Sequence, residues 1–250
     1  MISVRLQALK NSGKKKLAVI PFLMTFANAF LGLVAVLYAI EGQYNAAALS
    51  ILAAAFFDCL DGRTARKLGS TSLLGMELDS LCDAVSFCFA PAIILYSWKL
   101  YSLKAVGLLV VGFYLCSGLF RLARFNLLDD ESKKSYFVGL ATTVTASWIA
   151  SLVLASNWLQ QGKLAFIVKP QMLAFLIIFV AVLMSSYVRF PAFKNKRNWG
   201  MNTYAVLAAI FISSLYVVAT GGSVVFSVIS SYILSSIVID LLRVIKERLF

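Results

Sequence analysis

Long apolar segments, separated by short polar ones, run through most of the chain. Roughly 20 consecutive apolar residues are enough for one helix to cross a bilayer. The alternating pattern typical of a half-buried strand is not found in any segment. The sequence therefore predicts an all-α, polytopic transmembrane helical bundle of about eight spans. These spans are expected at residues 18–40, 44–63, 72–97, 105–125, 137–156, 171–190, 203–220 and 223–242.

The composition supports a membrane class and places the beginning of the chain outside the bilayer. Hydrophobic residues make up 61% of the sequence, whereas a soluble domain has roughly 45–50%. Residues 1–17 are basic and lead directly into a full-length apolar segment. We therefore expect residues 1–17 to lie on an anionic lipid surface as a juxtamembrane segment. Residues 18–250 are expected to form a single transmembrane domain.

The distribution of basic residues predicts the topology in the membrane. If the predicted helices alternate across the bilayer, only Lys99, Lys104, Lys163 and Lys169 fall on the side opposite the N-terminus. Because cytoplasmic loops carry the excess of Lys and Arg, both termini are expected in the cytoplasm of a multi-pass cell-membrane protein. The formal net charge of +12 is spread over short membrane loops. It therefore favours anionic lipids and phosphates as partners, and not nucleic acid.

The absence of histidine narrows the chemistry that is open to this chain. The sequence has no histidine and four cysteines, and none of the cysteines forms a CxxC pair. A histidine general base and a histidine-rich zinc site are thereby excluded. The cysteines are expected to be buried and reduced.

Four aspartates interrupt the apolar pattern near the ends of the second and third predicted helices. Asp58 and Asp61 are three residues apart, and Asp79 and Asp83 are four apart, so each pair shares one helix face. The short loop 63–71 joins the two helices, which brings both pairs together at the cytoplasmic face. Intramembrane acids are costly and are usually functional.

Several carboxylates in one place require cations. Oxygen ligands suit Mg²⁺ or Mn²⁺, with Ca²⁺ as a further option. Two such ions, about 3.5–4 Å apart, can clamp a diphosphate. Gly62 and Gly75 leave room beside the acids for a bulky ligand, and Arg66 adds a fixed positive charge. The alternative is an ion-pair network of the acids with Arg63 and Arg66.

The spacing of these residues is DxxDGxxAR, eight residues, then GxxxDxxxD, and it resembles the signature of the CDP-alcohol phosphotransferase family. The specified positions are Asp58, Asp61, Gly62, Ala65, Arg66, Gly75, Asp79 and Asp83. The resemblance implies a membrane-embedded helical fold, usually a homodimer, that displaces CMP from a CDP-linked lipid with an alcohol. It also implies that the four aspartates bind two divalent ions, and that Asp83 is the catalytic base as well.

The same resemblance assigns a set of residues to the nucleotide and diphosphate. Gly62 and Ala65 would lie along the nucleotide, and Asp58, Arg66 and Gly75 are also expected to bind the nucleotide or the diphosphate. Thr25 and Asn28 lie three residues apart on the first predicted helix, and the family has a similar polar pair that faces the nucleotide. Hydrogen bonding between membrane helices is the alternative role for this pair.

A second segment bears on the acceptor alcohol. The sequence RLARFN at 121–126, followed by YF-GL at 136–140, resembles the membrane-bound phosphatidylserine synthases of bacteria and archaea, a branch of this family. That branch usually has a proline at the position of Ala141. The resemblance implies that the phosphatidyl group of CDP-diacylglycerol, or of an ether-lipid analogue, is transferred to L-serine with release of CMP.

Three polar residues in this segment are candidates for the acceptor site. Arg121 and Arg124 share a helix face, and a guanidinium can hold the carboxylate of serine in bidentate fashion. Both arginines could instead mark the cytoplasmic end of the helix, and Asn126 could either orient the acceptor or cap that helix. Two arginines do not distinguish serine from glycerol 3-phosphate, and inositol phosphate and choline also remain open. A membrane prenyltransferase and a cation transporter are the alternatives outside the family.

Overall fold

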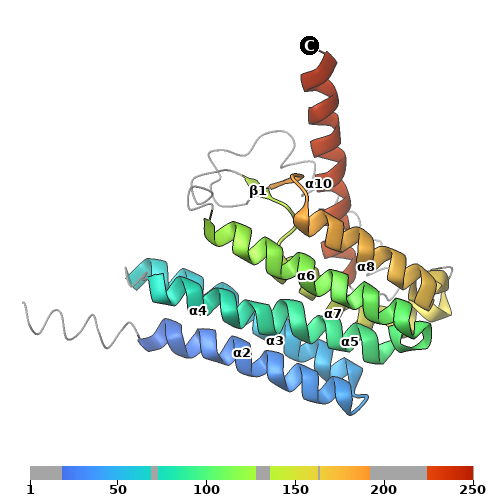
Figure 1. Ribbon diagram of the computed structural model, residues 1–250, viewed down its shortest axis with the longest axis horizontal. Coiled ribbons are helices and arrows are strands. Elements are labelled where there is room, and N and C mark those ends of the chain that lie inside the picture. The colour runs from blue at the N-terminus through green and yellow to red at the C-terminus, as the bar shows by residue number, and fades with distance from the viewer. Residues whose placement is uncertain (1–18, 69–72, 128–135, 163, 192–223, 250) are drawn as a thin grey trace, which may run out of the picture.

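The computed structural model describes residues 19–68, 73–127, 136–162, 164–191 and 224–249, and these are almost entirely helical. Figure 1 shows α2 to α8 lying side by side as a bundle, with α10 running at a steep angle to them. The helices are α2 (Val19–Ile40), α3 (Tyr44–Leu68), α4 (Leu73–Asp83), α5 (Ala90–Trp98), α6 (Ala105–Leu127), α7 (Thr142–Gln161), α8 (Pro170–Ser185) and α10 (Val224–Leu249).

Five helical segments of the described residues are long and apolar enough to cross a membrane. They are Pro21–Ile40, Tyr44–Thr64, Leu73–Trp98, Ala105–Leu127 and Val224–Leu241. This finding supports the predicted all-α membrane bundle. The expected spans at 137–156 and 171–190 correspond to α7 and the shorter apolar α8, and the span at 203–220 lies outside the described residues. The count of eight spans and the cytoplasmic termini stay predictions.

A short two-stranded sheet corrects the expectation that the chain has no strands. β1 (Tyr136–Val138) pairs antiparallel with β2 (Arg189–Pro191), with Phe137 opposite Phe190. Strands of three residues are too short to show an alternating pattern. The sheet joins the segment before α7 to the segment after α8.

The third predicted helix contains a π-helical segment, η1 (Ala84–Phe89), between α4 and α5. Pro91 follows it and has no N–H to donate to the carbonyl of Phe87, one turn earlier. The hydroxyl of the fully buried Tyr114 on α6 donates to that carbonyl at 2.8 Å. A π-bulge inside a helix is rare and is frequently found at functional sites.

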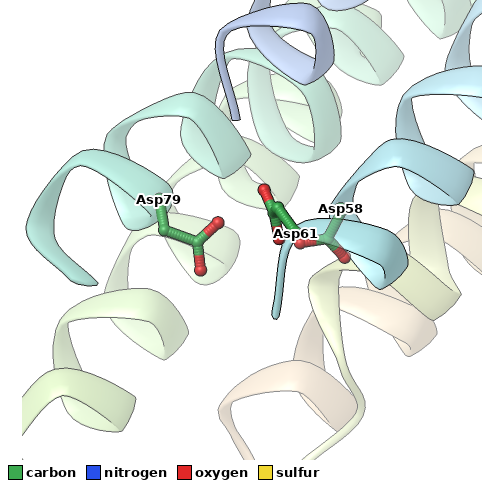
Figure 2. Close-up of side chains that lie close together, drawn as sticks. All are labelled: Asp58, Asp61 and Asp79. Carbon is green, nitrogen blue, oxygen red and sulfur yellow. The ribbon is translucent and has the colours of Figure 1, made fainter. Parts of the chain in front are cut away.

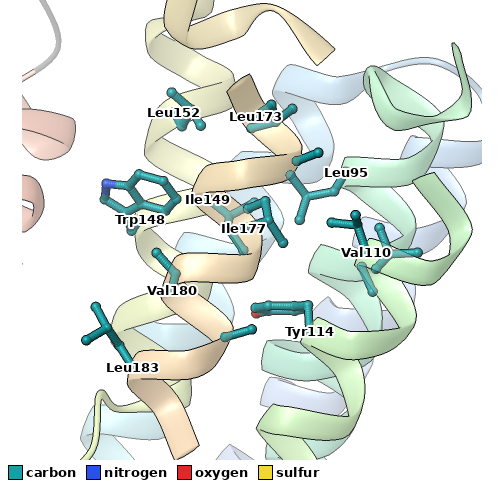
Figure 3. Close-up of a cluster of buried hydrophobic side chains, with 14 of the residues drawn as sticks. Leu95, Val110, Tyr114, Trp148, Ile149, Leu152, Leu173, Ile177, Val180 and Leu183 are labelled. Carbon is teal, nitrogen blue, oxygen red and sulfur yellow. The ribbon is translucent and has the colours of Figure 1, made fainter. Parts of the chain in front are cut away.

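Two buried clusters hold the helices together. Figure 3 shows the larger one, where side chains of α5, α6, α7 and α8 such as Leu95, Tyr114, Ile149 and Ile177 interdigitate. The smaller cluster lies between α2, α3, α5 and α7 and consists mainly of alanines, including Ala35, Ala47 and Ala54. Small residues let membrane helices approach closely. This close approach brings the end of α3 against α2, where the site is built.

Candidate active site

Three of the four predicted metal-binding aspartates converge in the structure. One carboxylate oxygen from each of Asp58, Asp61 and Asp79 lies within 4.8 Å of the other two. Figure 2 shows Asp58 and Asp61 on α3 facing Asp79 on α4. Asp61 is buried, whereas the other two are half-buried. The convergence follows from the spacing of three residues on α3 and from the packing of both α3 and α4 against α2.

Asp83 lies at the end of α4 and is held by α2. The amide Nδ2 of Asn28 donates to Asp83 Oδ1 at 3.0 Å. The hydroxyl of Ser86, in the π-helical segment, donates to the backbone carbonyl of Asn28 at 2.9 Å. A Cβ at Gly32 would collide with Ser86, so the glycine permits this close contact of the two helices. Asp83 is not one of the three converging acids, and its role as a fourth metal ligand stays a prediction.

The predicted polar pair on α2 faces these acids. Thr25 Oγ1 lies 3.0 Å from Asp61 Oδ2 and also 3.0 Å from the carbonyl of Pro21. Thr25 and Asn28 are both buried. The bonds of Thr25 to Asp61 and of Asn28 to Asp83 are hydrogen bonds between helices, which is the alternative role expected for this pair, and their acceptors are aspartates of the family motif. Nucleotide binding by this pair stays a prediction.

The site fits a divalent cation. Asp79 Oδ1 is buried and has no hydrogen-bond partner among the described residues. A buried carboxylate oxygen without a partner is costly, and such atoms usually have a hydrogen bond or an ion. The donor set consists of oxygens alone, which suits Mg²⁺, Mn²⁺ or Ca²⁺. These acids are therefore able to hold a hard divalent ion.

The remaining motif positions lie near the aspartate cluster. Their positions do not show whether they bind a nucleotide. Gly62 follows Asp61 on α3, and Gly75 lies one turn before Asp79 on α4. Arg63, part of the alternative ion-pair network, is exposed. The side chains of Ala65 and Arg66 lie outside the described residues. Contact of Gly62, Ala65, Arg66 and Gly75 with a nucleotide stays a prediction.

Arg124, a candidate acceptor ligand, is engaged with backbone carbonyls. Its guanidinium donates to Val138 O at 2.9 Å, to Ser185 O at 3.1 Å and to Ser186 O at 3.3 Å. The guanidinium also lies 5.6 Å from the centre of the Tyr187 ring. These contacts favour a structural role for Arg124 and leave its role in acceptor binding a prediction.

The other two acceptor candidates lie on the same helix. Arg121 is buried, with its guanidinium carbon 5.9 Å from the centre of the Phe125 ring. Asn126 joins α6 to α4, because Ser80 Oγ donates to Asn126 Oδ1 at 2.9 Å and Asn126 Nδ2 donates to Glu77 Oε2 at 3.4 Å. Ser80 and Glu77 lie on α4, so Asn126 links α6 to the helix that carries Asp79. Neither contact tests acceptor binding.

One residue at the site carries no signal in the sequence. Thr143, near the beginning of α7, donates from Oγ1 to Asp58 Oδ2 at 3.3 Å. A threonine at the start of an apolar helix is common, and this one is 85 positions from its acceptor. Only the tertiary packing of α3 against α7 reveals the contact.

Comparison with known proteins agrees with this geometry. The family model described as CDP-alcohol phosphatidyltransferase matches residues 18–186, and the chain belongs to this family. The chain is 35% identical to the CDP-diacylglycerol–serine O-phosphatidyltransferase of Helicobacter pylori strain J99 over 199 residues. The aligned residues make up 79% of this chain and 81% of the relative.

Two further relatives come from distant organisms. The protein of the same name from Bacillus subtilis is 33% identical over 176 residues, covering 70% of this chain and 92% of the relative. The archaetidylserine synthase of Methanothermobacter thermautotrophicus is 36% identical over 174 residues, covering 69% of each chain. The family expected from the DxxDGxxAR motif is thereby confirmed.

Proposed function

We propose that this chain is a CDP-diacylglycerol–serine O-phosphatidyltransferase, which transfers a phosphatidyl group to L-serine and releases CMP. The observation that carries the proposal is the convergence of Asp58, Asp61 and Asp79 within 4.8 Å, on the motif of a family that acts on CDP-alcohols. The serine acceptor is supported by the names of the H. pylori and B. subtilis relatives. The archaeal relative extends the possible donor to an ether-linked CDP-lipid.

The acids would hold two divalent cations, Mg²⁺ or Mn²⁺, with Asp83 as the fourth ligand. When bound, such ions polarise phosphoryl oxygens and stabilise charge on the leaving group. Gly62, Ala65, Arg66 and Gly75 would lie along the nucleotide and diphosphate of the donor. Thr25 and Asn28 line the same region from α2 through their contacts with Asp61 and Asp83.

Asp83 would act as the general base. Its carboxylate takes the proton of the serine hydroxyl, and the serine oxygen forms a bond with the lipid-side phosphorus. The bond from that phosphorus to the bridging oxygen breaks, and the electron pair leaves with CMP. Because Asn28 Nδ2 donates to Oδ1 of Asp83, the carboxylate is held in one orientation and Oδ2 can receive the proton.

The reaction would take place at the cytoplasmic face of the cell membrane. The acids lie near the end of α3 and in α4, at the ends of apolar helices. Acyl chains can stay in the bilayer while serine and CMP exchange with water. From the apolar segments and the distribution of basic residues we further propose eight spans with both termini in the cytoplasm. A homodimer is proposed because the family resemblance implies one.

An acceptor assay tests the proposed function. The purified full chain in detergent is mixed with CDP-diacylglycerol and Mn²⁺, and CMP release is measured with serine, glycerol 3-phosphate, inositol phosphate or choline. We expect acceptor-dependent CMP release with serine and incorporation of radiolabelled serine into lipid. Preference for another acceptor would overturn the serine assignment. Cation transport without CMP release would overturn the enzyme assignment altogether.

A further inference from the structure

A connection of backbone and side-chain contacts runs from α6 to the aspartate cluster. It begins at Arg124, passes through the turn between β1 and α7, and ends at Thr143. This connection includes the RLARFN and YF-GL segments, which the sequence associates with the acceptor. The contacts of these segments fix the position at which α7 begins.

The turn before α7 is fixed on several sides. Arg124 donates to Val138 O at 2.9 Å, the N–H of Gly139 donates to Val188 O at 2.9 Å, and the N–H of Leu140 donates to Leu183 O at 3.2 Å. Leu140 is fully buried. The turn is therefore tied to both α6 and the end of α8, and it has little freedom to shift.

Gly139 is the residue that allows the turn to come so close. Its φ of +77° is in the left-handed region that favours glycine. A Cβ at this position would lie 2.5 Å from the carbonyl oxygen of Met184 and 2.6 Å from Nη2 of Arg124. The conformation and the contact both require glycine, so Arg124 and Gly139 form one clamp.

The clamp sets where α7 begins. Ala141 is extended, with φ −64° and ψ 138°, and α7 follows from Thr142. Thr143 is therefore only a few residues from the fixed turn, and its hydroxyl reaches Asp58 Oδ2 at 3.3 Å. The hydrogen bond to Oδ2 limits rotation of the Asp58 carboxylate.

We propose that Thr143 is a positioning residue that orients the Asp58 carboxylate for a divalent cation, and that the Arg124–Gly139 clamp places Thr143 there. Partners that orient metal ligands by hydrogen bonds raise metal affinity, and their loss typically weakens binding by about 10- to 100-fold. The inference rests on the proposed function only in taking Asp58 as a metal ligand. It does not depend on which alcohol is the acceptor.

The test measures binding of Mn²⁺ alone to the full chain in detergent, by electron paramagnetic resonance titration. Thr143→Val keeps the shape and removes the donor, and we expect about 10-fold weaker binding. Thr143→Ser keeps the hydroxyl and should bind Mn²⁺ nearly as well as the unaltered chain. Thr143→Ala gives the same predicted loss with a smaller side chain, should valine disturb folding.

Thr145→Val is the matched control. Thr145 lies on the same helix and is fully buried, but its hydroxyl donates at 3.0 Å to Ala141 O in its own chain segment. We expect its Mn²⁺ affinity to be unchanged. Unaltered affinity in Thr143→Val, or equal losses in Thr143→Val and Thr145→Val, would overturn the proposal.

The double variant Arg124→Lys/Thr143→Val tests whether the clamp acts through Thr143. Arg124→Lys keeps the charge but replaces the two guanidinium nitrogens that bond the carbonyls with a single nitrogen. We expect a smaller loss of Mn²⁺ affinity than in Thr143→Val. If the clamp acts through Thr143, the double variant should bind Mn²⁺ no more weakly than Thr143→Val alone. Additive losses would contradict that route. A failure of serine transfer in the acceptor assay would leave these affinity differences intact, so the two proposals fail separately.

Discussion

The aspartate cluster and the Arg124 clamp both place charged side chains within apolar helices, but the two differ in the hydrogen bonds that those side chains make. The guanidinium of Arg124 donates to the carbonyls of Val138, Ser185 and Ser186, which belong to the chain itself. Asp79, in contrast, has a buried oxygen without a hydrogen-bond partner among the described residues. A charge that the fold satisfies stabilises the fold, whereas a charge left for an outside ligand serves function at the expense of stability.

Among the variants that compare the cluster with the clamp, the largest expected effect comes from Asp79→Asn. Because bound ions supply several kcal/mol of charge stabilisation and each 1.4 kcal/mol is tenfold in rate, CMP release should fall by roughly a thousand-fold. In a chelating buffer the variant should melt at or above the temperature of the unaltered chain, since a buried unsatisfied charge has been removed.

The matched control for this variant is Asp240→Asn. Asp240 pairs locally with Arg243 at 3.4 Å on α10, far along the chain from the cluster. We expect its rate of CMP release to stay near that of the unaltered chain. A large loss of thermal stability in Asp79→Asn would show that the cluster is structural, and would remove the contrast with the clamp.

In the clamp, Gly139→Ala should reduce stability. The left-handed φ and the contact with the carbonyl of Met184 together should cost about 2 kcal/mol or more in the free energy of unfolding. Unfolding by detergent titration measures this loss. Gly42→Ala is the control, because Gly42 has a φ of +76° but nothing within 4 Å of its added Cβ.

The difference between the two glycine variants isolates the crowding at the clamp. Gly42→Ala should cost only the strain of a left-handed residue, about 1 kcal/mol. Equal losses would mean that the added Cβ at position 139 meets no steric penalty from Met184 and Arg124, which would contradict the clamp.

The smallest expected effect is a gain from Ala141→Pro. Ala141 has φ −64°, which matches the angle that proline imposes. Its N–H donates no backbone hydrogen bond among the described residues. Proline here should raise the free energy of unfolding by about 0.4–1 kcal/mol through the unfolded state. Ala146→Pro, inside α7, should be strongly destabilising in the same unfolding assay.

The acidic site could be predicted from the sequence because its geometry is local. Asp58 and Asp61 are one helical turn apart, and a short loop leads to the helix that carries Asp79. Thr25 and Asn28 could be predicted as site residues for a similar reason, because they are two polar residues on one face of an otherwise apolar helix. Apolar length predicted five spans that the structure also describes.

The contacts of Thr143, Arg124 and β1 could not be predicted, because they depend on the packing of distant segments. Helical periodicity placed Arg121 and Arg124 on one face, but not the carbonyls of Ser185 and Ser186 that Arg124 binds. Strands of three residues carry no pattern of their own. In the π-helical segment after Asp83, the carbonyl of Phe87 accepts from Tyr114 on α6, a contact between different helices that the sequence does not reveal.

The most direct test of the account is Asp83→Asn, assayed in the full chain for serine-dependent CMP release and for CDP-diacylglycerol binding. The amide keeps the size of the side chain and removes the proton acceptor. We predict that turnover falls to background while binding of CDP-diacylglycerol stays measurable. Serine-dependent turnover at the rate of the unaltered chain would contradict the assignment of Asp83 as the base.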